Sequence, residues 1–139
     1  MVFTRDIMLE TQGNNDVVDL TPKVEKIVYQ SGIGYGICSV FCPGSTGGIT
    51  AIEFEGGAIE DFKRVVGALV PETDFYAHNE RWGDGNGHSH IRAALLGPSQ
   101  TFPVAEGQLV HGTWQQVVFV DFDVRPRSRR IVVTVVGDS

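Results

Sequence analysis

Hydrophobic residues recur at helical spacing in two segments of the chain. Thr21 and Pro22 are typical of a helix start, because threonine is a common N-cap and proline suits the first helical turn. Gly32 marks the end of that segment. In the second segment Pro71 follows a run with apolar residues at the i, i+3, i+4 spacing, at positions 59, 62, 65, 66 and 69. The pattern predicts two amphipathic helices.

Shorter apolar runs, rich in valine and isoleucine, predict strands. They cover residues 2–9, 35–42, 48–54, 91–96, 100–104, 108–110, 115–122 and 131–136. The two long C-terminal strands are almost continuous in apolar residues, which indicates that both of their faces are covered. The order of elements favours an α+β fold, with antiparallel sheets packed on each other and the two helices on the outside. We expect one domain spanning residues 1–139.

Composition narrows the class of protein. The chain has 139 residues, of which 42% are hydrophobic and 20% charged, so it is long enough and apolar enough to bury a core. Its net charge of −6 argues against a nucleic-acid-binding surface. No apolar run is long enough for a membrane span, and the first ten residues lack the apolar region of a signal peptide. We therefore expect a cytoplasmic protein that binds neither nucleic acid nor membranes.

The two cysteines, Cys38 and Cys42, lie in one predicted strand. Extended geometry separates their Cα atoms by about 13 Å, too far for a disulfide. We expect them to be buried, reduced thiols.

The candidate chemistry begins with the histidines, three of which fall at positions 78, 88 and 90. In a strand continuing through Ile91, His88 and His90 would point the same way, and the glycine-rich loop before them would let His78 fold back onto the pair. Imidazole is the commonest metal ligand near neutral pH. The sequence favours a divalent metal site, for zinc, magnesium or manganese. Solvent-exposed loop histidines and metal-free acid–base catalysis remain as alternatives.

Although the whole chain has more acidic than basic residues, residues 125–130 are strongly basic, with four arginines in six positions. The guanidinium group suits phosphate oxygens, so this run indicates a site for a phosphorylated small molecule. The alternative is a solvent-exposed turn whose arginines pair with Asp121 and Asp123. Glu53, in an otherwise apolar strand, needs a metal, an arginine or an edge position.

A larger pattern of motifs resembles a known family. The motifs are Tyr76-x-His78, Asn86-x-x-x-His90, Leu95-Leu96-Gly97-Pro98-Ser99, Val104-x-x-Gly107-x-Leu109, Gly112-Thr113-Trp114-Gln115 and Asp123-x-x-Pro126-Arg127-x-Arg129-Arg130. In this order and spacing they resemble the YjbQ family, also described as secondary thiamine-phosphate synthases. Residues 36–43 and 48–50 agree more weakly.

The resemblance implies a homotrimer of α+β subunits with a polar site near a subunit boundary. It also implies a metal-assisted transferase with weak thiamine-phosphate synthase activity. This activity joins an aminopyrimidine-methyl diphosphate to a thiazole phosphate and releases pyrophosphate. The alternative function is a non-catalytic homotrimer that binds a metal or a phosphometabolite.

Each site residue has an expected role under this resemblance. His78 and His90 would bind the metal, with His88 as a third ligand on the strand geometry described above, and Asp121 and Glu53 would be catalytic. Four residues would contact the substrate or its phosphate: Arg127, Arg129, Trp114 and Gln115.

The sequence departs from the family pattern at several of these positions. Gly44 replaces the histidine of the usual Pro-His-Thr-Thr-Ala-Gly segment, and we expect His88 to supply the lost imidazole. Ile52-Glu53 stands where the family has Asn-Glu, and Asp121 stands where it has glutamate.

Overall fold

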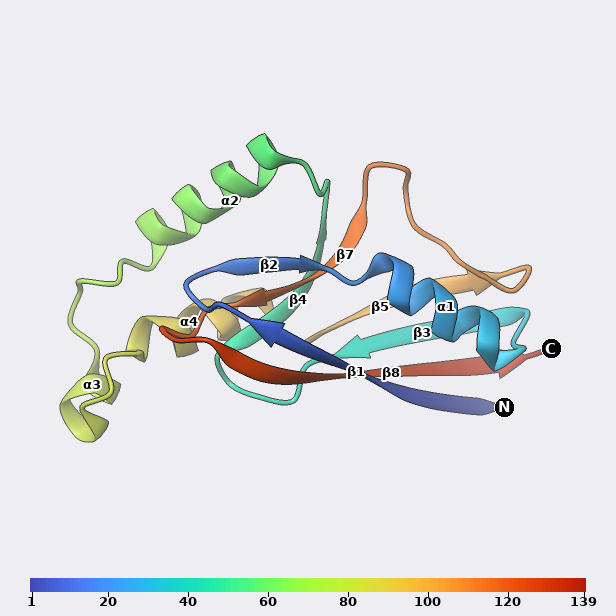
Figure 1. Ribbon diagram of the computed structural model, residues 1–139, viewed down its shortest axis with the longest axis horizontal. Helices are drawn as coiled ribbons and strands as arrows, with labels where there is room; N and C mark the ends of the chain where they lie inside the picture. Colours follow the sequence, from blue (N-terminus) through green and yellow to red (C-terminus); the bar gives the residue numbers. More distant parts are fainter.

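Two antiparallel sheets and four helices form the protein, and a computed structural model describes all of residues 1–139 (Figure 1). In chain order the elements are β1 (Val2–Thr11), β2 (Asp16–Asp19), α1 (Thr21–Ser31), β3 (Tyr35–Phe41), β4 (Gly47–Ile52), α2 (Gly56–Leu69), α3 (Ala77–Trp82), α4 (Gly87–Leu96), β5 (Ser99–Ala105), β6 (Gln108–Leu109), β7 (Gln116–Asp121) and β8 (Arg127–Asp138).

The larger sheet has the order β1-β8-β3-β5-β6, and the smaller has the order β2-β7-β4. Every strand pair is antiparallel. The first and last strands pair along their length, from Val2 opposite Val136 to Thr11 opposite Arg127. The predicted α+β class with antiparallel sheets is confirmed.

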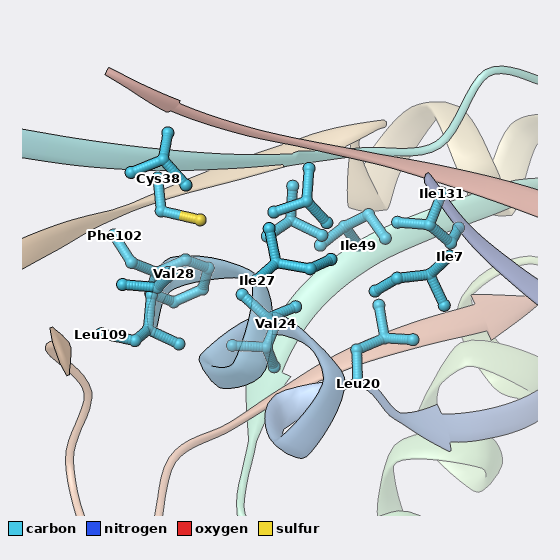
Figure 2. Close-up of a cluster of buried hydrophobic side chains, with 14 of the residues drawn as sticks. Ile7, Leu20, Val24, Ile27, Val28, Cys38, Ile49, Phe102, Leu109 and Ile131 are labelled. Atoms are coloured by element: carbon cyan, nitrogen blue, oxygen red, sulfur yellow. The ribbon is translucent and has the colours of Figure 1, made fainter. Parts of the chain in front are cut away.

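The main core lies between the two sheets and α1 (Figure 2). Val133 and Val135 of β8 meet Phe119 of β7 there, and α1 adds Val24 and Val28 from the face that the sequence pattern predicts. A smaller cluster on the other face of β7 joins its valines to Ala93 of α4 and to the half-buried side of α2. These two clusters fix both sheets in place behind the site described below.

Of the two strands predicted to be covered on both faces, only one is. Residues 117–121 of β7 are all buried, whereas β8 alternates between buried and outward-facing side chains. Val136, for example, is 41% exposed. No layer of this chain covers the outer face of the larger sheet, so the second cover predicted for β8 is absent within one chain and would have to come from a subunit interface.

The predicted strand at 91–96 is also wrong, because these residues belong to α4. A short apolar run does not by itself distinguish a strand from a buried helix, and its alanines, leucines and arginine favour a helix. The short helix α3 was not predicted either. The protein therefore has four helices where the pattern predicts two.

Cys38 and Cys42 are buried and unpaired, as expected. Burial raises the pKa of the Cys38 thiol to about 11. No helix in the structure is both long and apolar enough to cross a membrane.

Candidate functional site

A polar pocket of about 620 Å³ opens where three segments meet: the loop between β3 and β4, the α3–α4 region, and the turn that leads into β8. Fifteen residues line it, and only one of them is hydrophobic. The lining comprises Pro43, Gly44, Ser45, Thr46, His78, Trp82, Asp84, Asn86, His90, Asp123, Arg125, Arg127, Ser128, Arg129 and Arg130.

A buried ion pair forms the inner wall of the pocket. Arg129 donates from Nε and Nη2 to the two carboxylate oxygens of Asp121, each at 2.8 Å, and Nη2 also donates to Thr46 Oγ1 at 2.8 Å. Asp121 is completely buried and Arg129 is 6% exposed. Burial alone would raise the pKa of Asp121, but hydrogen bonds from Arg129, the Thr11 hydroxyl and the Asp123 amide lower it. The pair is therefore ionised, and each charge is satisfied by the other.

Asp123 organises the second wall. Its carboxylate accepts from Arg127 Nη1 at 2.9 Å, from Thr46 Oγ1 at 3.2 Å and from the backbone amide of Val124 at 2.8 Å. The side-chain amide of Asn86 lies 3.4 Å away. Burial would raise the pKa of Asp123, and these hydrogen bonds together with Arg127 lower it. Asp123 therefore holds Arg127 at the pocket with its own charge neutralised.

The arginines at the mouth of the pocket are less completely paired with carboxylates of the chain than Arg129 is. Arg125 is exposed and has no ion pair in the chain, and Arg127 keeps donors beyond the one that Asp123 accepts. Arg130 makes a single, exposed 3.5 Å contact with Asp6. Because the guanidinium of Arg is a forked donor, these side chains favour an anion with several oxygens.

Two histidines from different helices lie side by side in the lining of the pocket. The rings of His78 on α3 and His90 on α4 are 4.3 Å apart between centroids. Burial lowers the pKa of His90, and the neighbouring His78 lowers it further, against the opposing effect of Asp84 and Asp123. Neutral His90 can bind a metal or accept a proton.

His78 Nδ1 is buried and makes no hydrogen bond within the chain, although an Asp84 carboxylate oxygen lies 3.3 Å away in poor geometry. An unpaired buried nitrogen beside a carboxylate is a position that a bound ligand or cation would satisfy.

His88 does not join this pair, and the prediction that it faces the same way as His90 is wrong. Both lie on α4, where residues two apart point about 200° away from each other. His88 is 2% exposed and packs near Tyr76, with 6.2 Å between the ring centroids. Gly44 lines the pocket, where an added Cβ would lie 3.4 Å from Arg129 Nη1, whereas His88 does not line it, so the structure does not place the His88 imidazole where the missing histidine would be.

For the expected divalent metal, the pocket offers two imidazoles. Nowhere in the chain do three or more histidine, cysteine or acidic side chains gather as a metal site. A closed structural zinc site needs four such ligands. An ion held by His78 and His90 alone would need ligand or water oxygens for all of its remaining coordination positions.

His88 and the buried Asp121 do not line the pocket, and three further predicted site residues lie away from it. Gly47 and Asp121 pair at one end of the β4–β7 ladder, whereas Ile52 and Gln116 pair at the other, so Glu53 lies far from Asp121. Glu53 and the 74%-exposed Trp114 share a separate hollow. Gln115 accepts a hydrogen bond from Gly112. Within one subunit the structure therefore does not bring Glu53, Trp114 or Gln115 together with the arginines.

Other pocket residues were not singled out as site residues by the sequence. Ser45 comes from the loop between β3 and β4, and Trp82 from the unpredicted helix α3. Asp123 follows a fully buried strand, and a carboxylate in that position is a signal that could have identified it.

Fold and site together define a small α+β protein with antiparallel sheets and a pocket lined by arginines and histidines. The family model described as "UPF0047 protein YjbQ-like" matches residues 5–138. The chain belongs to this family.

Relatives share the chain over most of its length. A UPF0047 protein of Methanothermobacter thermautotrophicus is 40% identical over 136 residues, which are 98% of this chain and 93% of the relative. The UPF0047 protein YugU of Bacillus subtilis is 31% identical over 134 residues, 96% of this chain and 98% of the relative.

Solved structures show the same fold. A YbjQ-like protein of unknown function from Sulfolobus solfataricus P2 matches with a TM-score of 0.95 and 38% identity, covering 99% of each chain. A hypothetical protein from Aeropyrum pernix K1 matches with a TM-score of 0.90 and 30% identity, covering 97% of this chain and 98% of the other.

Proposed function

We propose that the pocket binds a phosphorylated small molecule through its outer arginines and acts on it beside the His78–His90 pair. The observation that carries this proposal is the presence of Arg125 and the remaining donors of Arg127 in a pocket with a single apolar lining residue. Such a lining attracts an anion and offers little to an uncharged apolar ligand.

The reaction that suits this arrangement is the transfer implied by the family resemblance. The ring nitrogen of a thiazole phosphate attacks the methylene carbon of an aminopyrimidine-methyl diphosphate. A C–N bond forms, the C–O bond to the diphosphate breaks, and pyrophosphate leaves with the bonding electrons. No proton has to be removed from the attacking nitrogen, so the protein mainly has to bind and neutralise the leaving group.

The residues divide this task. Arg125 and Arg127 hold the departing pyrophosphate, and the buried Asp121–Arg129 pair keeps the β8 side of the pocket rigid. A divalent cation held by His78 and His90 would neutralise further charge on the pyrophosphate.

A non-catalytic binding protein is the second candidate, and two observations favour it. Asp121, predicted to be catalytic, donates or accepts nothing at the pocket beyond its bonds to Arg129, Thr11 and Asp123. With glycine at position 44, the loop also brings no imidazole to the arginines.

A synthase assay distinguishes the two candidates. Wild-type protein, His90→Gln and His111→Gln are incubated with the two phosphorylated precursors and Mg²⁺, and thiamine phosphate is measured. His111 is a matched control, because it lies outside the pocket and bonds to Glu25 and the backbone. We expect product from wild type and His111→Gln, and about 10²-fold less from His90→Gln.

Failure of the wild-type protein to form product would reject the transferase and leave the binding protein. Equal product from wild type and His90→Gln would reject a role for the histidine pair.

We also propose that the protein is a homotrimer. The outer face of the larger sheet carries Ile37 and Phe41 of β3 beside Val136 of β8, exposed by 50%, 39% and 41% respectively. Nothing in the chain covers this apolar surface, and exposed patches of this kind commonly mark interfaces. The number of subunits rests on the family resemblance.

A further inference from the structure

A second groove, separate from the pocket, is lined by the edge strand β1 and by α1. It has a volume of about 380 Å³. Its lining is four consecutive residues of β1, Arg5 to Met8, and one face of α1 formed by Lys23, Lys26, Ile27 and Gln30. We propose that this groove binds an extended acidic segment of a partner protein, which adds to the larger sheet alongside β1.

The backbone of β1 supplies the first part of this argument. β1 is the outermost strand of its sheet and pairs only with β8, so alternate N–H and C=O groups along it point away from the sheet. From residue 5 to residue 10 these outward groups have no hydrogen-bond partner in the chain. With ten residues, β1 is far longer than β6, the two-residue strand at the opposite edge. Proteins usually shorten, cover or charge such an edge, and an open one is a template for strand addition.

Charge identifies the kind of segment. Arg5, Lys23 and Lys26 outnumber the single lining carboxylate, Asp6, although the whole chain carries −6. Neither lysine forms an ion pair in the structure, and both are exposed. A second copy of β1 would bring a second set of these cations next to the first, so like charges oppose self-pairing. Acidic side chains complement the groove.

The floor of the groove sets the pattern within the segment. Ile7 and Ile27 are buried and belong to the core cluster shown in Figure 2. An added strand would turn one set of alternate side chains toward α1, where the lysines flank Ile27, and the other set toward the opposite face of the sheet, where Asp6 and Met8 lie. The partner segment therefore alternates acidic residues with small apolar or β-branched ones.

Fluorescence anisotropy with a labelled Glu-Val-Glu-Thr-Glu-Val peptide tests the proposal. Two further peptides accompany it: one with lysine in place of glutamate, and one N-methylated at alternate backbone nitrogens. The protein variants are Lys26→Glu and a matched control, Lys63→Glu, an exposed lysine of α2 that changes net charge equally. Both substitutions are on the surface, and circular dichroism checks that the variants fold.

We expect wild type and Lys63→Glu to bind the acidic peptide and Lys26→Glu to bind it roughly tenfold more weakly, an effect that added salt reduces. The lysine peptide and the N-methylated peptide should not bind. Lack of binding by wild type at millimolar peptide, or equal binding by Lys26→Glu, would overturn the proposal. Equal binding of the N-methylated peptide would show charge attraction without strand addition and would overturn it too. So would a change of oligomeric state in Lys26→Glu, since a second copy would then occupy the groove.

Discussion

Asp121 is fully buried and charged, a combination that is stable only with complete hydrogen bonding. Arg129 supplies two hydrogen bonds, Thr11 a third and the Asp123 amide a fourth. Removing one partner would leave the other charge buried without compensation, which costs far more than the pair contributes. At the scale of single residues, the wall of the pocket therefore depends on this one ion pair.

Asp121→Asn should lower the free energy of unfolding by about 3–5 kcal/mol at pH 7, because it leaves Arg129 buried and unpaired. Urea denaturation measures the change. Asp6→Asn is the control, since Asp6 only meets the exposed Arg130 at 3.5 Å, and its loss should stay within about 0.5 kcal/mol. Equal losses in the two variants would contradict the structural role of the buried pair.

The destabilisation caused by Asp121→Asn should depend on pH. The folded-state pKa of Asp121 is lowered, so its stabilising effect is complete above its unfolded pKa of about 3.9 and is lost as pH falls through the folded value. The stability difference between wild type and Asp121→Asn should therefore be constant from pH 6 to 8 and shrink in strongly acidic solution. Denaturation series at several pH values measure it, and a difference that grows on acidification would have the wrong sign.

The sequence located several of these residues and left their roles open. The arginine run predicted either phosphate binding or pairing with Asp121 and Asp123, and the structure shows the pairing for Arg129 and Arg127. Asp121 was expected to be catalytic from its place in a motif. A motif gives the position of a residue in the sequence but does not show which side chains it contacts in the fold. The facing of His78 and His90 required the tertiary arrangement of two helices, which no spacing in the sequence specifies.

At the scale of elements, two glycines face each other where β3 pairs with β8. Gly36 lies opposite Gly137 in the ladder. A Cβ built on Gly36 would lie 2.0 Å from the carbonyl oxygen of Val136, and one on Gly137 would lie 2.1 Å from that of Tyr35. Both contacts involve backbone atoms, which cannot move without distorting the sheet.

Gly36→Ala should therefore destabilise the protein by at least about 2 kcal/mol. Gly67→Ala is the matched control: it lies inside α2 with no atom within 4 Å of an added Cβ, so alanine should be neutral or stabilise by up to about 1 kcal/mol. Thermal unfolding of both variants measures the difference. Similar melting temperatures would show that the strands tolerate a side chain at position 36.

The prediction of helices and strands succeeded where apolar residues recurred at helical spacing over a long segment and typical start and stop residues stood at its ends. Thr21, Pro22 and Gly32 delimit α1 almost to the residue. It failed at α4, where a six-residue apolar run carried no period that distinguishes a helix from a strand. Because residues 91–96 were predicted as a strand, His88 and His90 were predicted to point the same way. The expected three-histidine site therefore depended on a wrong secondary structure.

At the scale of the whole molecule, the two sheets bury one face each in the common core, and the outer face of the larger sheet stays open. We expect sedimentation velocity to give a trimer at micromolar concentration. Ile37→Lys should shift the population toward monomer because it places a charge in the centre of the open face. Val65→Lys, at an equally exposed position on α2, should leave the trimer intact. A monomeric wild-type protein would contradict the assembly.

The central claim is that the arginine- and histidine-lined pocket binds phosphate groups, and calorimetric titration of pyrophosphate tests it most directly. Wild type is compared with Arg127→Ala and with Arg64→Ala, an exposed arginine of α2 that pairs only with Asp61. Arg127→Ala should weaken binding by about 1.5–3 kcal/mol, the scale of a charge-assisted hydrogen bond, while Arg64→Ala binds as wild type does. Undetectable binding by wild type, or the same affinity in all three proteins, would contradict the account.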